Sequence, residues 1–213
     1  MDWTDNDTKI LLEEMRRTYP APECALEFQD RFQLLIAVIL SAQTTDKQVN
    51  VVTKDLFRKY PDAASLAAAD PAEVEETIRR IGMYKTKAKN ITAAARMLME
   101  AYGGEVPEDF DELVKLPGVG RKTANVVLAV GCGVPAIPVD THVFRVSNRI
   151  GIVCEKDVLK TELALMERLP EDTWIDMHHA LIWHGRRICK ARRPECDICP
   201  IADICRYTNG EKE

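Results

Sequence analysis

The stretch LPGVGRKTA, residues 116–124, combines two features that suit an anion. Gly118 and Gly120 have no side chains, so a ligand can approach the backbone around them closely. Pro117 is expected to end one helix and Arg121 to begin the next, and the unbonded N–H groups of a helix start attract phosphate. The spacing therefore favours a phosphate-docking turn, with a plain tight connection between two helices as the alternative.

Four cysteines near the C-terminus have the spacing of a metal centre. Six, two and five residues separate successive members of the set Cys189, Cys196, Cys199 and Cys205. Structural zinc sites with four cysteines usually pair two CxxC motifs roughly 15 to 20 residues apart, whereas this tail holds one such motif. The pattern favours a 4Fe–4S cluster, which cysteines alone can hold, and zinc is the alternative. The other cysteines are expected to be buried thiols: Cys24, Cys132 and Cys154.

The elements that must position these residues are helices almost throughout. Apolar residues recur at helical spacing, no segment alternates as a strand would, and Pro and Gly mark the connections. We therefore predict an all-α protein, with a linker in GCGVPAIPV, residues 131–139, where a second domain could begin. The expected helices span residues 6–19, 28–42, 46–59, 71–81, 87–102, 110–116, 122–130, 141–151, 156–169 and 172–187.

Size and composition indicate an ordinary globular protein of one large or two small domains. The chain has 213 residues, of which 46% are hydrophobic, enough for a substantial core. Its longest apolar run, residues 34–40, is far shorter than the ~20 residues of a membrane helix, and the N-terminus lacks the features of a signal peptide. We therefore expect a cytoplasmic protein with no membrane partner, in which cysteines bind metal or stay reduced.

Charge is distributed unevenly along the chain. The formal net charge of −5 by itself argues against a nucleic-acid partner. Yet residues 77–99 contain six basic and no acidic residues, residues 177–193 contain five and none, and residues 114–149 contain five against one. These windows favour one cationic face that suits a polyanion, with three solvated helix surfaces as the alternative. Three of the cations lie between the metal ligands, where a cluster would present them to a phosphate backbone: Lys190, Arg192 and Arg193.

Several motifs together resemble one enzyme family. LPGVGRKTANVVL has the helix-hairpin-helix pattern of duplex-binding proteins, VDTHVFRVSNR follows it, and LSAQTTDKQVN precedes it. With the cysteine tail, these motifs lie in order over residues 27–205. The chain thus resembles the endonuclease III family of DNA glycosylases with abasic-site lyase activity.

The resemblance implies a fold of two all-α lobes. One would be a helical barrel over residues 24–133 with the hairpin at about 112–131, and the other a discontinuous lobe of residues 1–23 and 134–213 with a 4Fe–4S loop at 189–205. It also implies a nucleoid-associated monomer that binds double-stranded DNA containing a damaged base or an abasic site. The implied lesions are oxidised, ring-saturated pyrimidines, and no magnesium or nucleotide would be required.

Within that resemblance, Lys122 matches the family's nucleophile. Cleaving an N-glycosidic bond and then the strand calls for an amine that adds to C1′ of the sugar and forms a Schiff base, from which β-elimination follows. At a helix start beside Arg121, the dipole and the neighbouring cation favour the neutral amine. Asp140 is expected to N-cap the next helix and, as an anion, to accept a proton from Lys122 or stabilise the cationic sugar.

Further residues match positions that would contact a flipped nucleotide. A base inside a duplex must leave the stack, and Gln43 is expected to fill the gap and bond the orphaned base, with Met83 as a wedge from the other side. A polar helix terminus and core packing are the alternatives for these two residues. Asp46 matches a pocket residue or simply N-caps a helix, and His142 would help shape the pocket. The remaining expected DNA contacts are Gly118, Val119, Gly120, Arg121 and Arg145.

Three other functions compete with this interpretation. A related adenine- or mismatch-specific glycosylase is one, although the adenine-excising relatives have a hydroxyl residue where Lys122 stands. A non-catalytic helix-hairpin-helix module is the second, and the pairing of Lys122 with Asp140 argues against it. A zinc-stabilised interaction protein is the third, which visible absorption of an iron–sulfur cluster would exclude.

Overall fold

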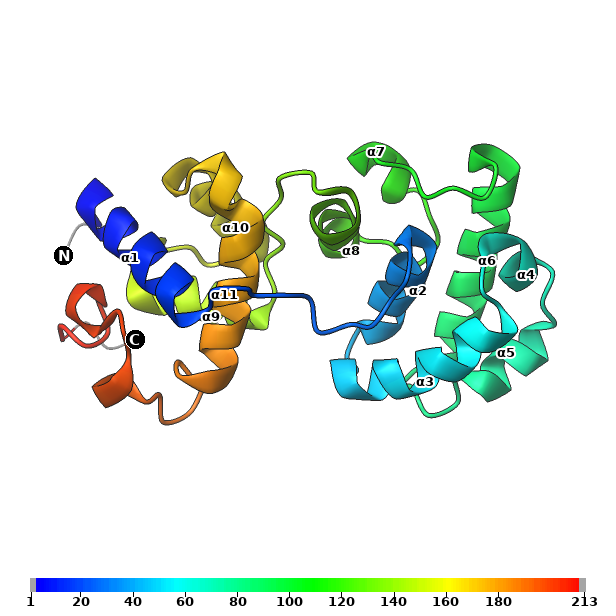
Figure 1. The fold of residues 1–213 in the computed structure, drawn as a ribbon, viewed down its shortest axis with the longest axis horizontal. Coiled ribbons are helices and arrows are strands. Elements are labelled where there is room, and N and C mark those ends of the chain that lie inside the picture. The colour runs from blue at the N-terminus through cyan, green and yellow to red at the C-terminus, as the bar shows by residue number, and fades with distance from the viewer. Residues whose placement is uncertain (1–2, 211–213) are drawn as a thin grey trace. The chain divides into compact units, whose positions relative to one another are not determined.

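The computed structural model describes residues 3–210, and within that range it contains helices and no strand (Figure 1). The predicted all-α class is thus confirmed. The chain divides into two compact units, a continuous unit, Cys24–Val134, and a discontinuous unit made of Met1–Glu23 and Pro135–Glu213. Each unit has its own apolar core. Every helix among the described residues is too short or too polar to cross a bilayer.

The continuous unit is built around one buried helix, α2 (Arg31–Ser41). Every residue from Phe32 to Leu40 is buried, which is the pattern of a helix surrounded by protein on all sides. Asp30 caps its start by accepting a hydrogen bond from the backbone N–H of Gln33 at 2.8 Å. The other elements of the unit are α3 (Asp46–Lys59), α4 (Ala63–Ala67), α5 (Pro71–Thr77), α6 (Tyr84–Tyr102), α7 (Phe110–Leu113), α8 (Arg121–Val126) and the π-helix η1 (Val127–Cys132).

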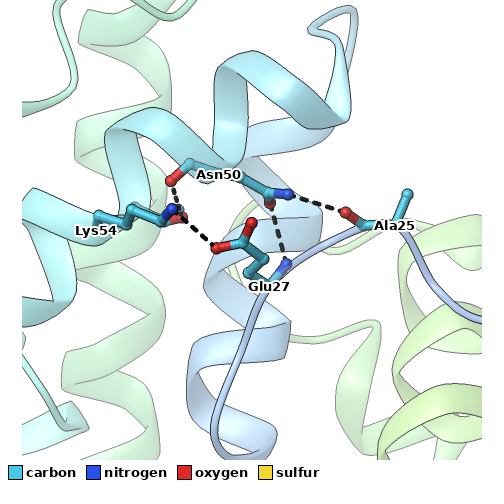
Figure 2. A network of polar contacts seen from close by, with 5 residues as sticks. Ala25, Glu27, Asn50 and Lys54 are labelled. Carbon is cyan, nitrogen blue, oxygen red and sulfur yellow. Dashed lines mark hydrogen bonds and ion pairs between the residues drawn. The ribbon is translucent and has the colours of Figure 1, made fainter.

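Asn50 on α3 fixes the segment that leads into α2 (Figure 2). Its side-chain amide donates to the carbonyl of Ala25 at 2.9 Å and accepts from the backbone N–H of Glu27 at 3.0 Å. Lys54, one turn further along α3, lies 3.2 Å from the Glu27 carboxylate. These contacts hold the start of the continuous unit against α3.

The discontinuous unit packs α11 (Trp174–Arg187) against α1 (Asp5–Thr18) and α9 (Thr141–Ile150). Gly185 allows the approach of α9, because a Cβ at this position would lie 3.1 Å from the Cβ of His142. Helix α10 (Val158–Arg168) packs on α9 from another side. The remaining elements are 3₁₀ turns: η2 (Glu171–Thr173), η3 (Cys196–Ile198) and η4 (Ala202–Ile204).

The helices depart from the sequence-based bounds at several points. The short helix α4 was not expected, and its cap is Asp62, which bonds Ser65 in both directions. The helix expected over residues 122–130 becomes a π-helix after Val126, where it lies against α2. There a Cβ on Gly131 would lie 2.9 Å from the Cδ2 of Leu34, so a larger residue would require the Leu34 side chain to shift.

The expectation of three buried thiols outside the cysteine tail is wrong in one case and only partly met in two. Cys154 is exposed, because it lies in the loop after α9 and not on a packed helix face. Cys24 and Cys132 are half-buried. Burial raises the pKa of the Cys132 thiol.

Candidate functional site

The hairpin between α7 and α8 uses its two glycines differently. Gly118 has a positive φ of 82°, and a Cβ there would lie 3.0 Å from the Cβ of Asn90 and 3.2 Å from Ile39. Gly118 is therefore required by the fold. Gly120 has an ordinary φ of −98°, and apart from Gly120 and its two chain neighbours no described residue has an atom within 4 Å of the place a Cβ would occupy. The space outside Gly120 is thus open to a ligand.

The backbone amides of the hairpin divide in the same way. The N–H of Val119 donates to the carbonyl of Leu116 at 3.0 Å, and the Val119 side chain is buried in the core. Val119 was expected to contact phosphate, but neither its amide nor its side chain is available to donate. Among the described residues, the amides of Gly118, Gly120 and Lys122 donate to no protein acceptor. These amides lie before and within the first turn of α8, where an anion would complete the helix start.

Lys122 lies in the first turn of α8 with an exposed side chain. Within the described part of the chain, no acidic group forms an ion pair with its amine. Arg121 beside it lies over the ring of Phe110, with 5.1 Å from its Cζ to the ring centroid, which joins α8 to α7. Lys122 therefore presents a primary amine to solvent from a fixed backbone.

Asp140 is the N-cap of α9 in the discontinuous unit. Its Oδ1 accepts hydrogen bonds from the backbone N–H groups of His142 and Val143, both at 2.8 Å. No described residue bonds its Oδ2. The preceding linker is held by His178 on α11, whose Nδ1 lies 2.7 Å from the carbonyl of Pro138 and must donate to it. The cap confirms the predicted local role, and it leaves one carboxylate oxygen available.

Gln43 and Met83 both have left-handed backbone conformations, with φ values of 54° and 57°. Non-glycine residues adopt this conformation only where the surroundings impose it. Both residues are exposed, and 53% of the Met83 surface is accessible. The alternative that Met83 packs in the core is therefore wrong.

Three other expected site residues have specific roles in the fold. Thr45, and not Asp46, caps α3 by accepting from the backbone N–H of Gln48 at 3.3 Å, and Asp46 is the first helical residue. His142 lies against Gly185, and burial lowers its pKa. Arg145 donates to the carbonyls of Gly185 at 2.9 Å and Cys189 at 3.0 Å, so its guanidinium joins α9 to the end of α11.

Two cations of the basic windows lie inside the protein and not on its surface. Lys87 is 4% exposed and Arg149 is 8% exposed. Arg149 donates to the carbonyl of Lys190 at 2.8 Å and its Nη1 lies 3.7 Å from the sulfur of Cys189. The expectation that the basic windows contribute to one cationic face therefore needs correction at these two positions. Arg192 and Arg193, in the cysteine loop, are exposed.

The four tail cysteines lie in the discontinuous unit, close enough for Cys199 to feel the charges of the other three. Cys189 and Cys205 are buried, and Cys196 and Cys199 are half-buried. Burial raises the pKa of the Cys189 thiol, and it raises that of Cys199 to about 11. Four such thiolates need a bound cationic group to offset their charge. Among residues 3–210, no group of three or more His, Cys, Asp or Glu side chains is arranged around a single ion.

N–H groups directed at the sulfurs also suit an iron–sulfur cluster. Nε2 of His184 lies 3.6 Å from the sulfur of Cys199, while its Nδ1 lies 3.2 Å from the hydroxyl of Tyr19. Burial lowers the pKa of His184 to about 4, so the ring is neutral. Nδ1 can then accept from Tyr19, and Nε2–H can donate to the sulfur. Neither His184 nor Arg149 was identified from the sequence, because no local spacing links them to the cysteines.

Two family models match the chain. Residues 36–171 match the model described as HhH-GPD superfamily base excision DNA repair protein. Residues 189–205 match that of the iron-sulfur binding domain of endonuclease III. The second match spans all four tail cysteines.

Similar proteins extend over nearly the whole chain. Endonuclease III of Bacillus subtilis (strain 168) is 52% identical over 205 residues, which cover 96% of this chain and 93% of that protein. Endonuclease III of Escherichia coli (strain K12) is 46% identical over 197 residues, or 92% and 93% of the two chains.

Solved structures of the same fold include complexes with DNA. A trapped endonuclease III–DNA covalent intermediate, in an estranged-adenine complex, aligns with a TM-score of 0.92 and 48% identity, covering 97% of this chain and 98% of that one. A thermostable thymine-DNA glycosylase aligns with a TM-score of 0.87 and 25% identity, covering 98% and 99%.

Two substitutions of similar size at Gly120 test whether a phosphate docks in the open space there. Gly120→Asp should weaken binding to undamaged and lesion-containing duplexes alike, by about tenfold, because a carboxylate would face the phosphate. Gly120→Asn has nearly the same size and can cap α8 equally well, so it should bind more tightly than the Asp variant. Fluorescence anisotropy measures both affinities.

Thermal unfolding distinguishes docking from folding in the same series. Both Gly120 variants should melt at or above the wild-type temperature, because φ is ordinary and a cap is gained. Gly118→Ala should lower the free energy of unfolding by about 1 to 3 kcal/mol. Equal DNA affinities for Gly120→Asp and Gly120→Asn would contradict the phosphate-docking role.

The cysteine tail generates a prediction about metal content. The purified protein should contain about four irons per chain and absorb broadly in the visible. Cys196→Ser should lose iron and melt at a lower temperature, because the loop loses a ligand. Metal analysis that finds stoichiometric zinc in colourless protein would overturn the assignment.

Proposed function

Because the chain belongs to the endonuclease III family of the HhH-GPD superfamily, we propose that it excises oxidised pyrimidines from duplex DNA through a Schiff base on Lys122. The matching family models and relatives confirm the family resemblance inferred from the motifs. The chain is a base-excision repair enzyme, a DNA glycosylase with abasic-site lyase activity, that binds DNA and carries one 4Fe–4S cluster.

The single observation that supports the nucleophile most directly is the placement of Lys122. Its amine is exposed in the first turn of α8, directly after the hairpin turn whose open amides suit a phosphate. A backbone phosphate docked on the hairpin would bring the adjoining sugar towards that amine. The similar endonuclease III that was trapped covalently on DNA is consistent with such an attachment.

The proposed reaction begins with attack of Lys122 on the sugar. The Lys122 nitrogen bonds to C1′ while the glycosidic bond breaks, and the departing base takes that electron pair and a proton. The amine's other proton goes to the ring oxygen O4′, which also takes the electron pair of the breaking C1′–O4′ bond, so the sugar ring opens and a C=N bond forms between C1′ and Lys122. Loss of a 2′ proton then expels the 3′ phosphate, and water releases the free amine.

Asp140 is proposed to support the first step. Its Oδ1 is committed to the cap of α9, and its Oδ2 is left to accept a proton or stabilise the cationic sugar. Gln43 and Met83 are proposed to fill the space that the flipped nucleotide leaves, and Asp46 and His142 to border its pocket. The protein is proposed to act as a monomer without magnesium or a nucleotide.

The 4Fe–4S cluster is assigned a structural role. When bound by Cys189, Cys196, Cys199 and Cys205, it would tie the C-terminal loop to α11 and offset the charge of four thiolates. The exposed side chains of Arg192 and Arg193 would then extend from a fixed loop towards phosphate.

A mismatch-directed glycosylase is the second candidate, because the thermostable thymine-DNA glycosylase shares the fold over nearly its whole length. Its identity of 25% is about half that of the endonuclease III relatives. Excision rates on duplexes with an oxidised pyrimidine or a G·T mismatch separate the candidates. Faster excision at the mismatch would favour the second one.

The nucleophile is tested by trapping with borohydride. Wild-type protein and a duplex with a ring-saturated thymine should give a stable adduct and a nick 3′ to the lesion without added magnesium. Lys122→Ala and Lys122→Arg should give neither product. Lys122→Arg keeps the positive charge, so its affinity for abasic DNA should stay near the wild-type value. An adduct formed at the wild-type rate by either variant would mean that another amine attacks.

Asp140 allows the chemistry to be separated from the helix cap. Asp140→Asn retains a side-chain oxygen for the two N–H groups, so its melting temperature should change little. Its single-turnover excision should slow by roughly 10²- to 10⁴-fold, because the amide cannot carry the negative charge. Asp140→Ala should also lose about 1 kcal/mol of stability. Wild-type excision by Asp140→Asn would restrict Asp140 to its capping role.

A further inference from the structure

Lys87 is a buried cation without a carboxylate partner among the described residues. It lies on α6 and is 4% exposed. Its ammonium donates to the carbonyl of Leu40 at 2.8 Å, to that of Ala42 at 2.6 Å and to the hydroxyl of Thr44 at 3.0 Å. All three donors of the ammonium are thus directed at one short segment.

That segment is the end of α2 and the turn that follows it. The last carbonyls of a helix have no partner inside the helix, and a cation favours the negative end of the helix dipole. Burial lowers the pKa of Lys87, so keeping an amine at this depth opposes its charge. The three oxygens offset that cost only while the turn keeps its shape.

The three bonds of the ammonium surround Gln43 without touching it. Ala42 and Thr44 are its two chain neighbours, and Gln43 between them has a left-handed backbone and an exposed side chain. A left-handed conformation is unfavourable for glutamine by itself and persists only where neighbouring contacts impose it. Lys87 provides those contacts.

Lys87 is also bonded to the second left-handed, exposed residue. Its backbone N–H donates to the carbonyl of Met83 at 3.0 Å, which begins α6. This is the first backbone bond of the helix, which any residue at this position would make, so only the turn at Gln43 depends on the lysine side chain. Both turns belong to the continuous unit.

We propose that Lys87 is a positioning residue for base flipping, which holds Gln43 in the conformation that enters the base stack. This inference rests on the proposed role of Gln43. Lys87 itself would touch neither DNA nor the reacting atoms. Its contribution is that the inserting side chain is ordered before DNA binds, so binding does not have to order it.

The test compares Lys87→Met with Lys89→Met. Both substitutions remove one lysine charge from α6, but Lys89 is exposed and contacts none of the turn oxygens. Lys87→Met should lose about tenfold or more in single-turnover excision while its affinity for undamaged duplex stays within about twofold of the control. A 2-aminopurine placed opposite the lesion should report loss of the inserted side chain in Lys87→Met alone.

A double-mutant cycle with Gln43→Ala decides whether Lys87 acts through Gln43. If it does, adding Lys87→Met to Gln43→Ala should slow excision by much less than Lys87→Met slows the wild-type protein. Fully multiplicative losses would overturn the inference and leave Lys87 with a general structural role. A Gln43→Ala variant that excises and changes 2-aminopurine fluorescence like the wild type would instead refute the proposed role of Gln43.

Thr44→Val provides a second variant should Lys87→Met fail to fold. It removes one of the three acceptors and leaves both carbonyl bonds in place. It should show a smaller loss with the same non-additivity towards Gln43→Ala. Wild-type behaviour of Thr44→Val in excision and fluorescence would count against the positioning role.

Discussion

The continuous unit depends on a buried helix that has to end inside the protein. Helix α2 is buried from Phe32 to Leu40, so packing can hold it, but its terminal carbonyls still require donors. Ser41 bonds the carbonyl of Val38, the N–H of Thr44 bonds that of Ser41, and Lys87 bonds those of Leu40 and Ala42. The chain can therefore turn sharply after α2 and return on α3, with Gln43 at the outer point of the turn.

Packing against α2 also explains why the two hairpin glycines are not equivalent. Gly118 faces Ile39 on α2 and Asn90 on α6, where a side chain would separate the hairpin from the core. Val119 then packs inwards, and the chain emerges at Gly120 with its amide unbonded. One glycine thus serves the packing of the hairpin on α2, and the other leaves the surface open where α8 begins.

Local chemistry explains which parts could be predicted from the sequence. The helix class, the α3 bounds, the cap at Asp140 and the match of the cysteine tail to an iron-sulfur binding domain follow from residues close together in the chain. The π-helix, Lys87, His184 and Arg149 depend on neighbours far away in sequence. Lys87 bonds oxygens more than forty positions earlier, and in the sequence it looks like any surface lysine of a basic window.

Each unit of the protein contains a buried cation from one of the basic windows. Arg149 bonds the loop after Cys189 through the carbonyl of Lys190, as Lys87 bonds the turn at Gln43. In both places a cation counted as part of a DNA-facing surface instead bonds the backbone next to an exposed side chain. Electrostatic attraction to phosphate then falls to the exposed cations, and the buried ones determine where the exposed side chains are held. A count of charges along the sequence cannot separate these two classes, because burial is set by the packing of distant helices.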